Sequence, residues 1–595
     1  MNLIRQDKIL YPLILSLFCL IGFAIYLEAY PYGLSFAIMA ICETIFMVSL
    51  FVIFPQKWGG IISCIGVVIF LISIFCNLVY SRILLGGTNS ISRTIPIEYL
   101  LLLDSAADNM IVSNVLDCLK ITDIVFPIAI IILILLWIIR RKSISLIRYS
   151  LKQKCFIVIA VILCFTFEQA KLIHNVSCNL SNKSFSNVFN NYKNNYYFSN
   201  VFYHGYIWHY NFSIIGLLIP PSDLNEKELS LLDSKLNTEY PPLDESLKYS
   251  FEQNSDKNVI MIIVESLNSK VLDFEPENIR VMPTIDSLIK AENSISFTKV
   301  YSQIGNGISS DGHLMYLSGL LPSRLGVMIT ESLGSPLPSL ARTLNKEHSF
   351  ECIGENPKIW FHNYTNKMYG FDELYSKLVP ELDTTWVDID SKLLKRSQKI
   401  ISSQKSSFFS FITTISSHSP YKSNRIPYKS NIAQLKNFEE RDKIYMETLN
   451  YTDKQIKIFL DSLKSNGLYD NSVIVIASDH YPPTNSISEK LNTKLIPVII
   501  LNASDKCIKI DRIIGQVDIY PTLLDILGCK LETAKWKGLG ESAFRCDNRC
   551  VVDIDGNSVG ENNDPEEIAR YKELYKLSFR LVETKYFKDH PELLN

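Results

Sequence analysis

The sequence predicts an α-helical membrane domain followed by an α/β domain with a mainly parallel sheet. The first observation behind this prediction is an uneven distribution of charge over the 595 residues. Residues 1–174 contain 13 Lys and Arg and 9 Asp and Glu, so about 13% are charged, against about 23% of residues 175–595, an ordinary value for a soluble protein. The second observation is an alternation of apolar strand-like runs and helical patterns after residue 258. We therefore expect a membrane domain over 1–174, a connecting segment over 175–257 and an α/β domain over 258–595.

Five apolar stretches in the first domain are long enough to cross a hydrocarbon core of about 30 Å. The loops that would face the cytoplasm carry nine Lys and Arg, whereas the opposite loops carry three. The positive-inside rule therefore predicts a cytoplasmic N-terminus, and five spans place the α/β domain on the extracytoplasmic side of the cell membrane. The acidic Glu43 lies in the second predicted span. It either has a function within the membrane or forms a hydrogen bond to a neighbouring helix. The predicted spans are 9–29, 34–54, 58–80, 121–139 and 155–173.

The connecting segment has two parts of different composition. Residues 190–221 mix aromatic and apolar side chains, which is typical of a helix lying on a membrane surface, although packing on the α/β domain fits the pattern equally well. Residues 222–257 are polar and charged, and we interpret them as a linker.

Charge and cysteine usage exclude several classes of protein. The net charge is −2, and neither half is basic enough to predict nucleic-acid binding. None of the 13 cysteines has Cys-x-x-Cys zinc spacing. The sequence leaves open whether Cys546 and Cys550 form a disulfide or remain two free thiols.

The α/β domain contains four apolar runs that read as buried parallel strands, together with a long helical pattern at 439–465. Polar residues follow three of these runs directly: Glu265, the segment around His418, and the pair Asp479 and His480. Open α/β sheets build their sites at the carboxyl ends of strands, and carboxylates with imidazoles are metal ligands. The sequence therefore predicts a metal-type site there, with loop capping as the alternative. The expected strands are 259–264, 408–415, 473–476 and 495–501.

A glycine-containing turn at 305–307 precedes Ser309 and Ser310 and then an apolar helical segment at 314–321. Serines near a helix N-terminus lie beside free N–H groups that favour a phosphate or an alkoxide. Taken alone, the same pattern reads equally well as a helix N-cap.

Several motifs in a fixed order resemble the lipoteichoic acid synthase family, which are membrane phosphoglycerol transferases of the sulfatase/alkaline phosphatase superfamily. The resemblance covers about residues 255–535, and it implies a sulfatase-like α/β fold for the extracytoplasmic domain. Five N-terminal spans are also typical of the family. The sulfatase signature for a formylglycine is absent around Ser309, which argues against sulfate-ester hydrolysis. The motifs lie at 258–267, 305–311, 354–360, 417–421, 478–480 and 517–524.

The resemblance implies a site for one divalent cation, usually manganese, with magnesium or zinc as alternatives. By motif, its ligands are Glu265, Ser309, Asp479 and His480. Ser309 is then the nucleophile, in place of the usual threonine of the family.

The remaining motif positions imply how the substrate is held. His418 matches a substrate-site histidine that binds the head group or carries a proton, and Trp360 matches an aromatic pocket wall. His362 stands where the family has an arginine, so the head group recognised is open.

The resemblance implies a metal-dependent transferase that moves a phosphoglycerol head group from phosphatidylglycerol to a glycan or lipid acceptor. The reaction passes through a covalent phospho-Ser309 intermediate. Alternatives within the superfamily are a phosphoethanolamine transferase that uses phosphatidylethanolamine and a hydrolytic phosphodiesterase. The non-enzyme alternative is a degenerate membrane sensor or scaffold. The expected partners are a phospholipid donor and an envelope acceptor, with no nucleic acid and no obligatory protein partner.

Overall fold

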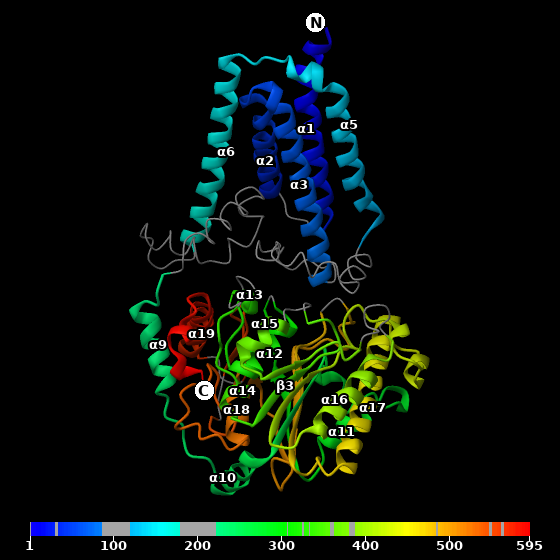
Figure 1. The fold of residues 1–595 in the computed structure, drawn as a ribbon, viewed down its shortest axis with the longest axis vertical. Helices are drawn as coiled ribbons and strands as arrows, with labels where there is room; N and C mark the ends of the chain where they lie inside the picture. Colours follow the sequence, from blue (N-terminus) through cyan, green and yellow to red (C-terminus); the bar gives the residue numbers. More distant parts are fainter. Residues whose placement is uncertain are drawn as a thin grey trace. The chain divides into compact units, whose positions relative to one another are not determined.

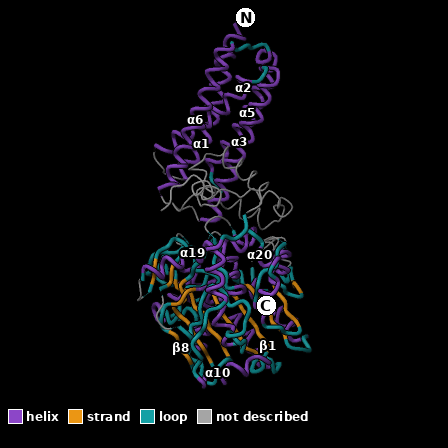
Figure 2. Tube along the Cα trace, turned by 90° about the vertical axis from the view of Figure 1, so that its left-hand side faces the viewer, coloured by secondary structure: helices purple, strands orange, loops and turns teal. Residues whose placement is uncertain are grey.

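The computed structural model describes most of the chain, and its described residues form two compact units that meet in sequence at residues 220 and 221. Figures 1 and 2 show a helical unit and an α/β unit, and each is treated separately below. The described ranges are 2–29, 34–85, 119–178, 222–305, 307–323, 327–331, 334–357, 362–379, 387–483, 486–546, 550–560 and 564–594.

Helices occupy all five stretches in which membrane spans are expected. Within the described residues, two segments are long and apolar enough to cross a membrane, Trp58–Cys76 and Ile121–Ser145, and Ala40–Ile53 is a shorter apolar helix. A helical N-terminal region with two candidate spans is therefore established, and the crossing of all five helices stays a prediction. The helices are α1 (Asn2–Ala29), α2 (Leu34–Ile53), α3 (Gln56–Leu85), α5 (Val125–Ser145) and α6 (Leu151–Cys178).

The helical unit buries apolar side chains inside and exposes others. Leu15 of α1 and Phe51 of α2 are fully buried, whereas Phe156 of α6 is 73% exposed. Exposed apolar side chains on long helices are expected where lipid replaces water. Asp7 is buried and pairs with Arg140 at 3.3 Å.

The α/β unit is built on a nine-stranded mixed sheet that is mostly parallel. Its strand order is β4-β3-β5-β1-β6-β7-β2-β8, with β9 beside β2, and the five strands from β4 to β6 run parallel. The strands are β1 (Asn258–Val264), β2 (Ser294–Tyr301), β3 (His348–Cys352), β4 (Glu373–Tyr375), β5 (Phe408–Thr413), β6 (Ser472–Ser478), β7 (Leu495–Leu501), β8 (Ile508–Ile510) and β9 (Ile514–Gly515), and a separate hairpin pairs β10 (Val551–Val552) with β11 (Ser558–Val559).

One expectation about the sheet is wrong. The run 495–501 was expected to be a parallel strand, but β7 runs antiparallel to both β6 and β2. The physical reason is the connection between β6 and β7, in which the described residues form no helix. A parallel β7 would need a crossover, usually through a helix, that brings the chain back to the edge where β6 begins. The chain instead enters β7 from the edge where β6 ends, which makes the two strands antiparallel.

Helices cover both faces of the sheet, as Figure 1 shows. Ile260 and Ile262 of β1 pack in the core with residues of α16 and α17, while the alternate Met261 is buried toward the opposite face, where α12 lies. The predicted helix at 439–465 is confirmed as α17. The described α-helices that follow β1 in this unit are α11 (Pro283–Leu288), α12 (Ser309–Ser318), α13 (Met328–Glu331), α14 (Leu340–Thr343), α15 (His362–Tyr369), α16 (Ile389–Ser403), α17 (Glu440–Ser465), α18 (Ile519–Ile526), α19 (Pro565–Glu583) and α20 (Tyr586–Asp589).

The polar stretch 222–257, expected as a linker, contains two helices that pack on the α/β unit, α9 (Glu226–Leu236) and α10 (Glu245–Glu252). The Phe251 ring of α10 lies 5.2 Å from the ring of Phe544. Asn254 donates side-chain hydrogen bonds to the carbonyls of Ala503 and Ile526. The compact unit therefore begins near residue 221. The apolar-aromatic stretch 190–221 lies outside the described residues.

Candidate metal and nucleophile site

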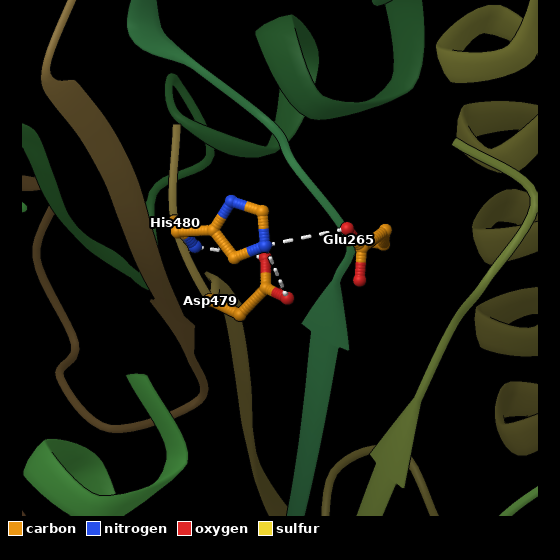
Figure 3. Close-up of side chains that lie close together, drawn as sticks. All are labelled: Glu265, Asp479 and His480. Atoms are coloured by element: carbon orange, nitrogen blue, oxygen red, sulfur yellow. Dashed lines mark hydrogen bonds and ion pairs between the residues drawn. The ribbon is translucent and has the colours of Figure 1, made fainter. Parts of the chain in front are cut away.

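Three side chains with metal-ligand chemistry meet at the carboxyl edge of the parallel strands. Glu265 follows β1 directly, and Asp479 and His480 follow β6. Because Val264 is paired with Ser478 at the end of these neighbouring strands, the next residues of both strands emerge side by side. Figure 3 shows the imidazole of His480 facing both carboxylates.

The ligand atoms of this triad are close together and buried. His480 Nε2 lies 3.3 Å from Glu265 Oε1 and 3.4 Å from Asp479 Oδ2. One donor atom from each of the three residues fits within a 4.8 Å cluster, and all three side chains are buried. Such spacing allows one small cation to be bound by all three at once.

Ser309 is the first residue of α12 and contacts this cluster. Its Oγ lies 3.1 Å from His480 Nε2 and donates to Glu265 Oε2 at 3.5 Å. The preceding residue, Ile308, has φ 49° and ψ −108°, which is rare for a β-branched residue. Strained backbone of this kind is found at functional sites, where the surrounding structure holds a side chain in place.

Close contact between α12 and the end of β6 holds Ser309 against the triad. A Cβ at Gly312 would lie 2.3 Å from the carbonyl oxygen of Asp479, so only glycine allows this approach. Tyr316 donates its hydroxyl to the Ser478 carbonyl at 2.6 Å. The second serine, Ser310, instead donates to the carbonyl of Gly307 at 2.8 Å. The two serines are therefore distinguished by their contacts.

His418 lies on the loop after β5, beside Glu265. Asp390 accepts the backbone N–H groups of Ile415 and Ser416 at 2.9 and 3.1 Å and so fixes the start of this loop. Burial lowers the pKa of His418, so the imidazole is neutral at pH 7 and able to accept a proton. Its Nδ1 contacts the carbonyl of Ser419.

The electrostatics of the triad favour a bound positive charge. Burial by itself would lower the pKa of His480, but the charges of Asp479 and Glu265 raise it. Burial and the neighbouring Glu265 raise the pKa of Asp479. Burial would also raise the pKa of Glu265, but the nearby His418 and His480 hold it below its usual range. Two carboxylates this close need a proton or a cation between them.

The residues present fit a divalent cation. Asp479 Oδ2 is buried and accepts no hydrogen bond from the described residues, which leaves a lone pair for a metal. Two carboxylates, one imidazole and one hydroxyl make a mostly hard donor set, which suits Mn²⁺, Mg²⁺ or Zn²⁺ without choosing among them. Glu265, Asp479, His480 and Ser309 would hold the ion.

A second buried cluster surrounds His362, at the start of α15. His362 Nδ1 lies 2.9 Å from Glu351 Oε1, and its Nε2 lies 3.2 Å from Glu355 Oε1. Burial by itself would lower the pKa of His362, but Glu351 and Glu355 raise it to about 10. Both ring nitrogens thus bind carboxylates, and Glu355 Oε2 is buried without a hydrogen-bond partner among the described residues.

His313 connects this second cluster with the first. It lies one turn after Ser309 on α12, and its ring packs edge-on against Phe411, 5.1 Å between centroids. Phe411 is the β5 neighbour of Glu351 in the sheet register. Burial and then the charge of His362 lower the pKa of His313 to about 3, so it is neutral.

Comparisons with known proteins agree with this geometry. Residues 257–529 match the sulfatase family model. Lipoteichoic acid synthase 2 of Bacillus subtilis (strain 168) is 26% identical over 326 residues, which are 51% of this chain and 49% of the relative. Lipoteichoic acid synthase of Staphylococcus aureus (strain USA300) is 25% identical over 325 residues, 50% of this chain and 49% of the relative. By sequence the chain is lipoteichoic acid synthase-like over about half of its length, and residues 257–529 are similar to a sulfatase domain.

A solved structure supports the fold of the sulfatase domain. The crystal structure of the lipoteichoic acid synthase LtaP from Listeria monocytogenes superposes with a TM-score of 0.50 at 17% identity, over 60% of this chain and 98% of that chain. The expected sulfatase-like α/β fold of this domain is thereby confirmed. The chain matches about half the length of its curated relatives.

The sulfatase domain brings together most of the residues that the sequence singled out. Glu265, Ser309, Asp479 and His480 form one cluster with His418 beside it, whereas His362 belongs to the second cluster. Trp360 lies outside the described residues.

Sequence reasoning missed Ser266, His313, Glu351 and Glu355. Glu355 follows β3, a strand that the apolar pattern did not reveal because its exposed first residue and its Ser and Glu interrupt the run. The position of His313 four residues after Ser309, on the same helix face, was a usable signal.

Proposed function

We propose that this lipoteichoic acid synthase-like protein is a metal-dependent transferase that moves phosphoglycerol from phosphatidylglycerol to an envelope glycan or lipid acceptor. The observation that carries the proposal is the position of Ser309 Oγ, 3.1 Å from His480 Nε2 and 3.5 Å from Glu265 Oε2. A hydroxyl at this point reaches both a cation held by the triad and a phosphorus atom bound in front of it. The names of the curated relatives support the same activity.

The chemistry follows from the residues around Ser309. A divalent cation at the triad would lower the pKa of the Ser309 hydroxyl and offset charge on the phosphoryl oxygens. Ser309 Oγ forms a bond to phosphorus as the bond from phosphorus to the diacylglycerol oxygen breaks. The hydroxyl proton passes to that leaving oxygen, and we assign its transfer to His418, whose imidazole is neutral.

The second half reaction regenerates the serine. An acceptor hydroxyl attacks phosphorus, the bond from phosphorus to Ser309 Oγ breaks, and the acceptor proton returns to Ser309. His418 again carries the proton, because a neutral imidazole both accepts and donates one. Water as the acceptor turns the same sequence into hydrolysis, which is the phosphodiesterase alternative.

Membrane location follows from the donor. We propose that all five N-terminal helices span the cell membrane with the N-terminus in the cytoplasm, and that residues 258–595 act on its extracytoplasmic side. The donor and an envelope acceptor are the partners. The single cation is manganese in this proposal, with magnesium and zinc as alternatives that residue types do not separate.

Phosphoethanolamine is the second candidate head group, and the cluster at His362 favours it. The family arginine at this position is a cation free to bind phosphate or glycerol, but His362 is held on both nitrogens by Glu351 and Glu355. Two carboxylates and one imidazolium leave a net negative charge, and Glu355 Oε2 lacks a partner among the described residues. An ammonium group suits such a position better than an anion does.

The test measures diacylglycerol release by the full-length protein with Mn²⁺ in liposomes of phosphatidylglycerol or of phosphatidylethanolamine. Ser309→Ala should abolish release, and Ser310→Ala is the matched control because its hydroxyl binds Gly307. Release from phosphatidylglycerol alone supports the first candidate, and release from phosphatidylethanolamine alone supports the second. Head group recovered only as the free phosphate ester identifies a phosphodiesterase. Absence of turnover from both lipids, with Mn²⁺ bound and an acceptor present, would overturn the transferase.

A further inference from the structure

Ser266 occupies an unusual position between the two carboxylates of the triad. It is completely buried and follows Glu265 at the end of β1. Its φ is +55°, in the left-handed region that non-glycine residues rarely adopt. This conformation is strained for serine and unstrained for glycine. The surrounding structure must therefore hold the buried serine in it.

Three hydrogen bonds hold Ser266 in place. Its hydroxyl donates to Glu265 Oε1 at 2.7 Å, and its backbone N–H donates to Asp479 Oδ1 at 2.9 Å. Its carbonyl accepts the Tyr445 hydroxyl at 2.8 Å. The residue therefore bridges a carboxylate from β1 and a carboxylate from β6.

The Ser266 hydroxyl binds Glu265 Oε1, which also lies 3.3 Å from His480 Nε2, and leaves Oε2 toward Ser309. The N–H groups of Ser266 and His480 both bind Asp479 Oδ1 and leave Oδ2 toward the His480 ring. Glu265 Oε2 remains to accept from Ser309, and Asp479 Oδ2 accepts no hydrogen bond from the described residues. With Ser266 in place, each carboxylate offers one oxygen to a cation, in a fixed orientation.

Other groups fix the backbone of Glu265 but leave its carboxylate free to turn. Its N–H donates to Thr414 Oγ1 at 3.2 Å, and its carbonyl accepts the Ser417 hydroxyl at 2.6 Å. Among the described residues, the hydroxyls of Ser266 and Ser309 and the His480 ring contact the carboxylate oxygens of Glu265.

We propose that Ser266 is a positioning residue for the metal site: its hydroxyl and its N–H orient Glu265 and Asp479 so that one oxygen of each points to the cation. This inference rests on the metal site of the proposed function. Partners that orient metal ligands in this way typically contribute about 10- to 100-fold to metal affinity.

The experiment titrates Mn²⁺ into the full-length protein, following free Mn²⁺ by electron paramagnetic resonance and folding by thermal melting of the metal-free protein. Ser266→Gly removes the whole side chain and relieves the left-handed strain, whereas Ser266→Ala removes only the hydroxyl and keeps the strain. Ser417→Ala is the matched control, because it removes another buried hydroxyl that binds the backbone of Glu265 rather than its carboxylate.

We expect both Ser266 variants to bind Mn²⁺ about tenfold or more weakly than the natural protein. Ser266→Gly should melt at or above the temperature of Ser266→Ala, and Ser417→Ala should stay within about threefold of the natural affinity. Natural affinity in Ser266→Gly would overturn the inference, since the residue would then serve the backbone alone. Equal losses in Ser266→Gly and Ser417→Ala would overturn it too. If the natural protein binds no Mn²⁺, the metal site of the proposed function fails, and this inference fails with it.

Discussion

Replacement of His362 by glutamine should change how the stability of the protein depends on pH. In the folded protein Glu351 and Glu355 raise the pKa of His362 to about 10, whereas an unfolded histidine titrates near its ordinary value of about 6.5. Between these two values the folded state holds one proton more than the unfolded state. The stabilising contribution of His362 to the free energy of unfolding is therefore complete below about pH 6.5 and is lost as the pH rises through about 10.

The magnitude follows from that single proton. A difference of one bound proton lowers the free energy of unfolding by about 1.4 kcal/mol for each pH unit. Between pH 7.5 and 9.5 the natural protein should therefore lose about 2 to 3 kcal/mol more than His362→Gln does. The pair of carboxylates around His362 is buried, so salt should screen this contribution only weakly.

Denaturant unfolding of the purified protein at several pH values measures this difference. His590→Gln is the matched control: His590 also pairs with a glutamate, Glu592, at 3.1 Å, but on the surface at 40% exposure. A surface pair contributes little, so this variant should keep the natural slope. Parallel pH profiles for the natural protein and His362→Gln would refute the reasoning, because His362 would then carry no extra proton in the folded state.

Three further changes should have measurable effects. Gly312→Ala places a Cβ 2.3 Å from the Asp479 carbonyl and should weaken Mn²⁺ binding by about tenfold or more; an unchanged titration would contradict the close approach of α12 to β6. Asp390→Ala removes the acceptor of two N–H groups before His418 and should lower the free energy of unfolding, measured in urea, by about 1 to 3 kcal/mol. A change near zero would contradict this role of Asp390. Arg545→Met leaves Asp525 buried without its ion pair at 2.7 Å and should cost about 3 to 5 kcal/mol in the same assay, whereas a gain in stability would show that the pair is dispensable.

Much of the candidate site could be predicted because its residues follow recognisable strands. Glu265 directly follows the apolar run of β1, and Asp479 and His480 directly follow that of β6. Strand identity and strand end are local properties of a sequence, so the location of these groups at one edge of the sheet was predictable. Ser309 was predictable in the same way, since a turn and an apolar helical pattern flank it.

Local sequence patterns could not predict the interactions around His362 and Ser266. Glu351 lies within β3, where a buried acid reads as an interruption of a strand rather than as a partner for a histidine 11 residues later. The N–H of Ser266 binds Asp479, 213 residues away. Contacts between distant residues depend on strand order and register, and no local pattern contains that information.

The sequence by itself determined the two-part organisation, the membrane-type composition of the N-terminal third and the residue types of a metal and nucleophile site, because composition, periodicity and strand ends are local features. Only the tertiary structure decided the antiparallel direction of β7, the packing of α10 on the α/β unit, and the distance of the Ser309 hydroxyl from the triad. It also decided that His362 is held between two carboxylates. The physical reason is that direction, packing and charge pairing are properties of residues brought together across the chain, and their energies exist only once the sheet has formed.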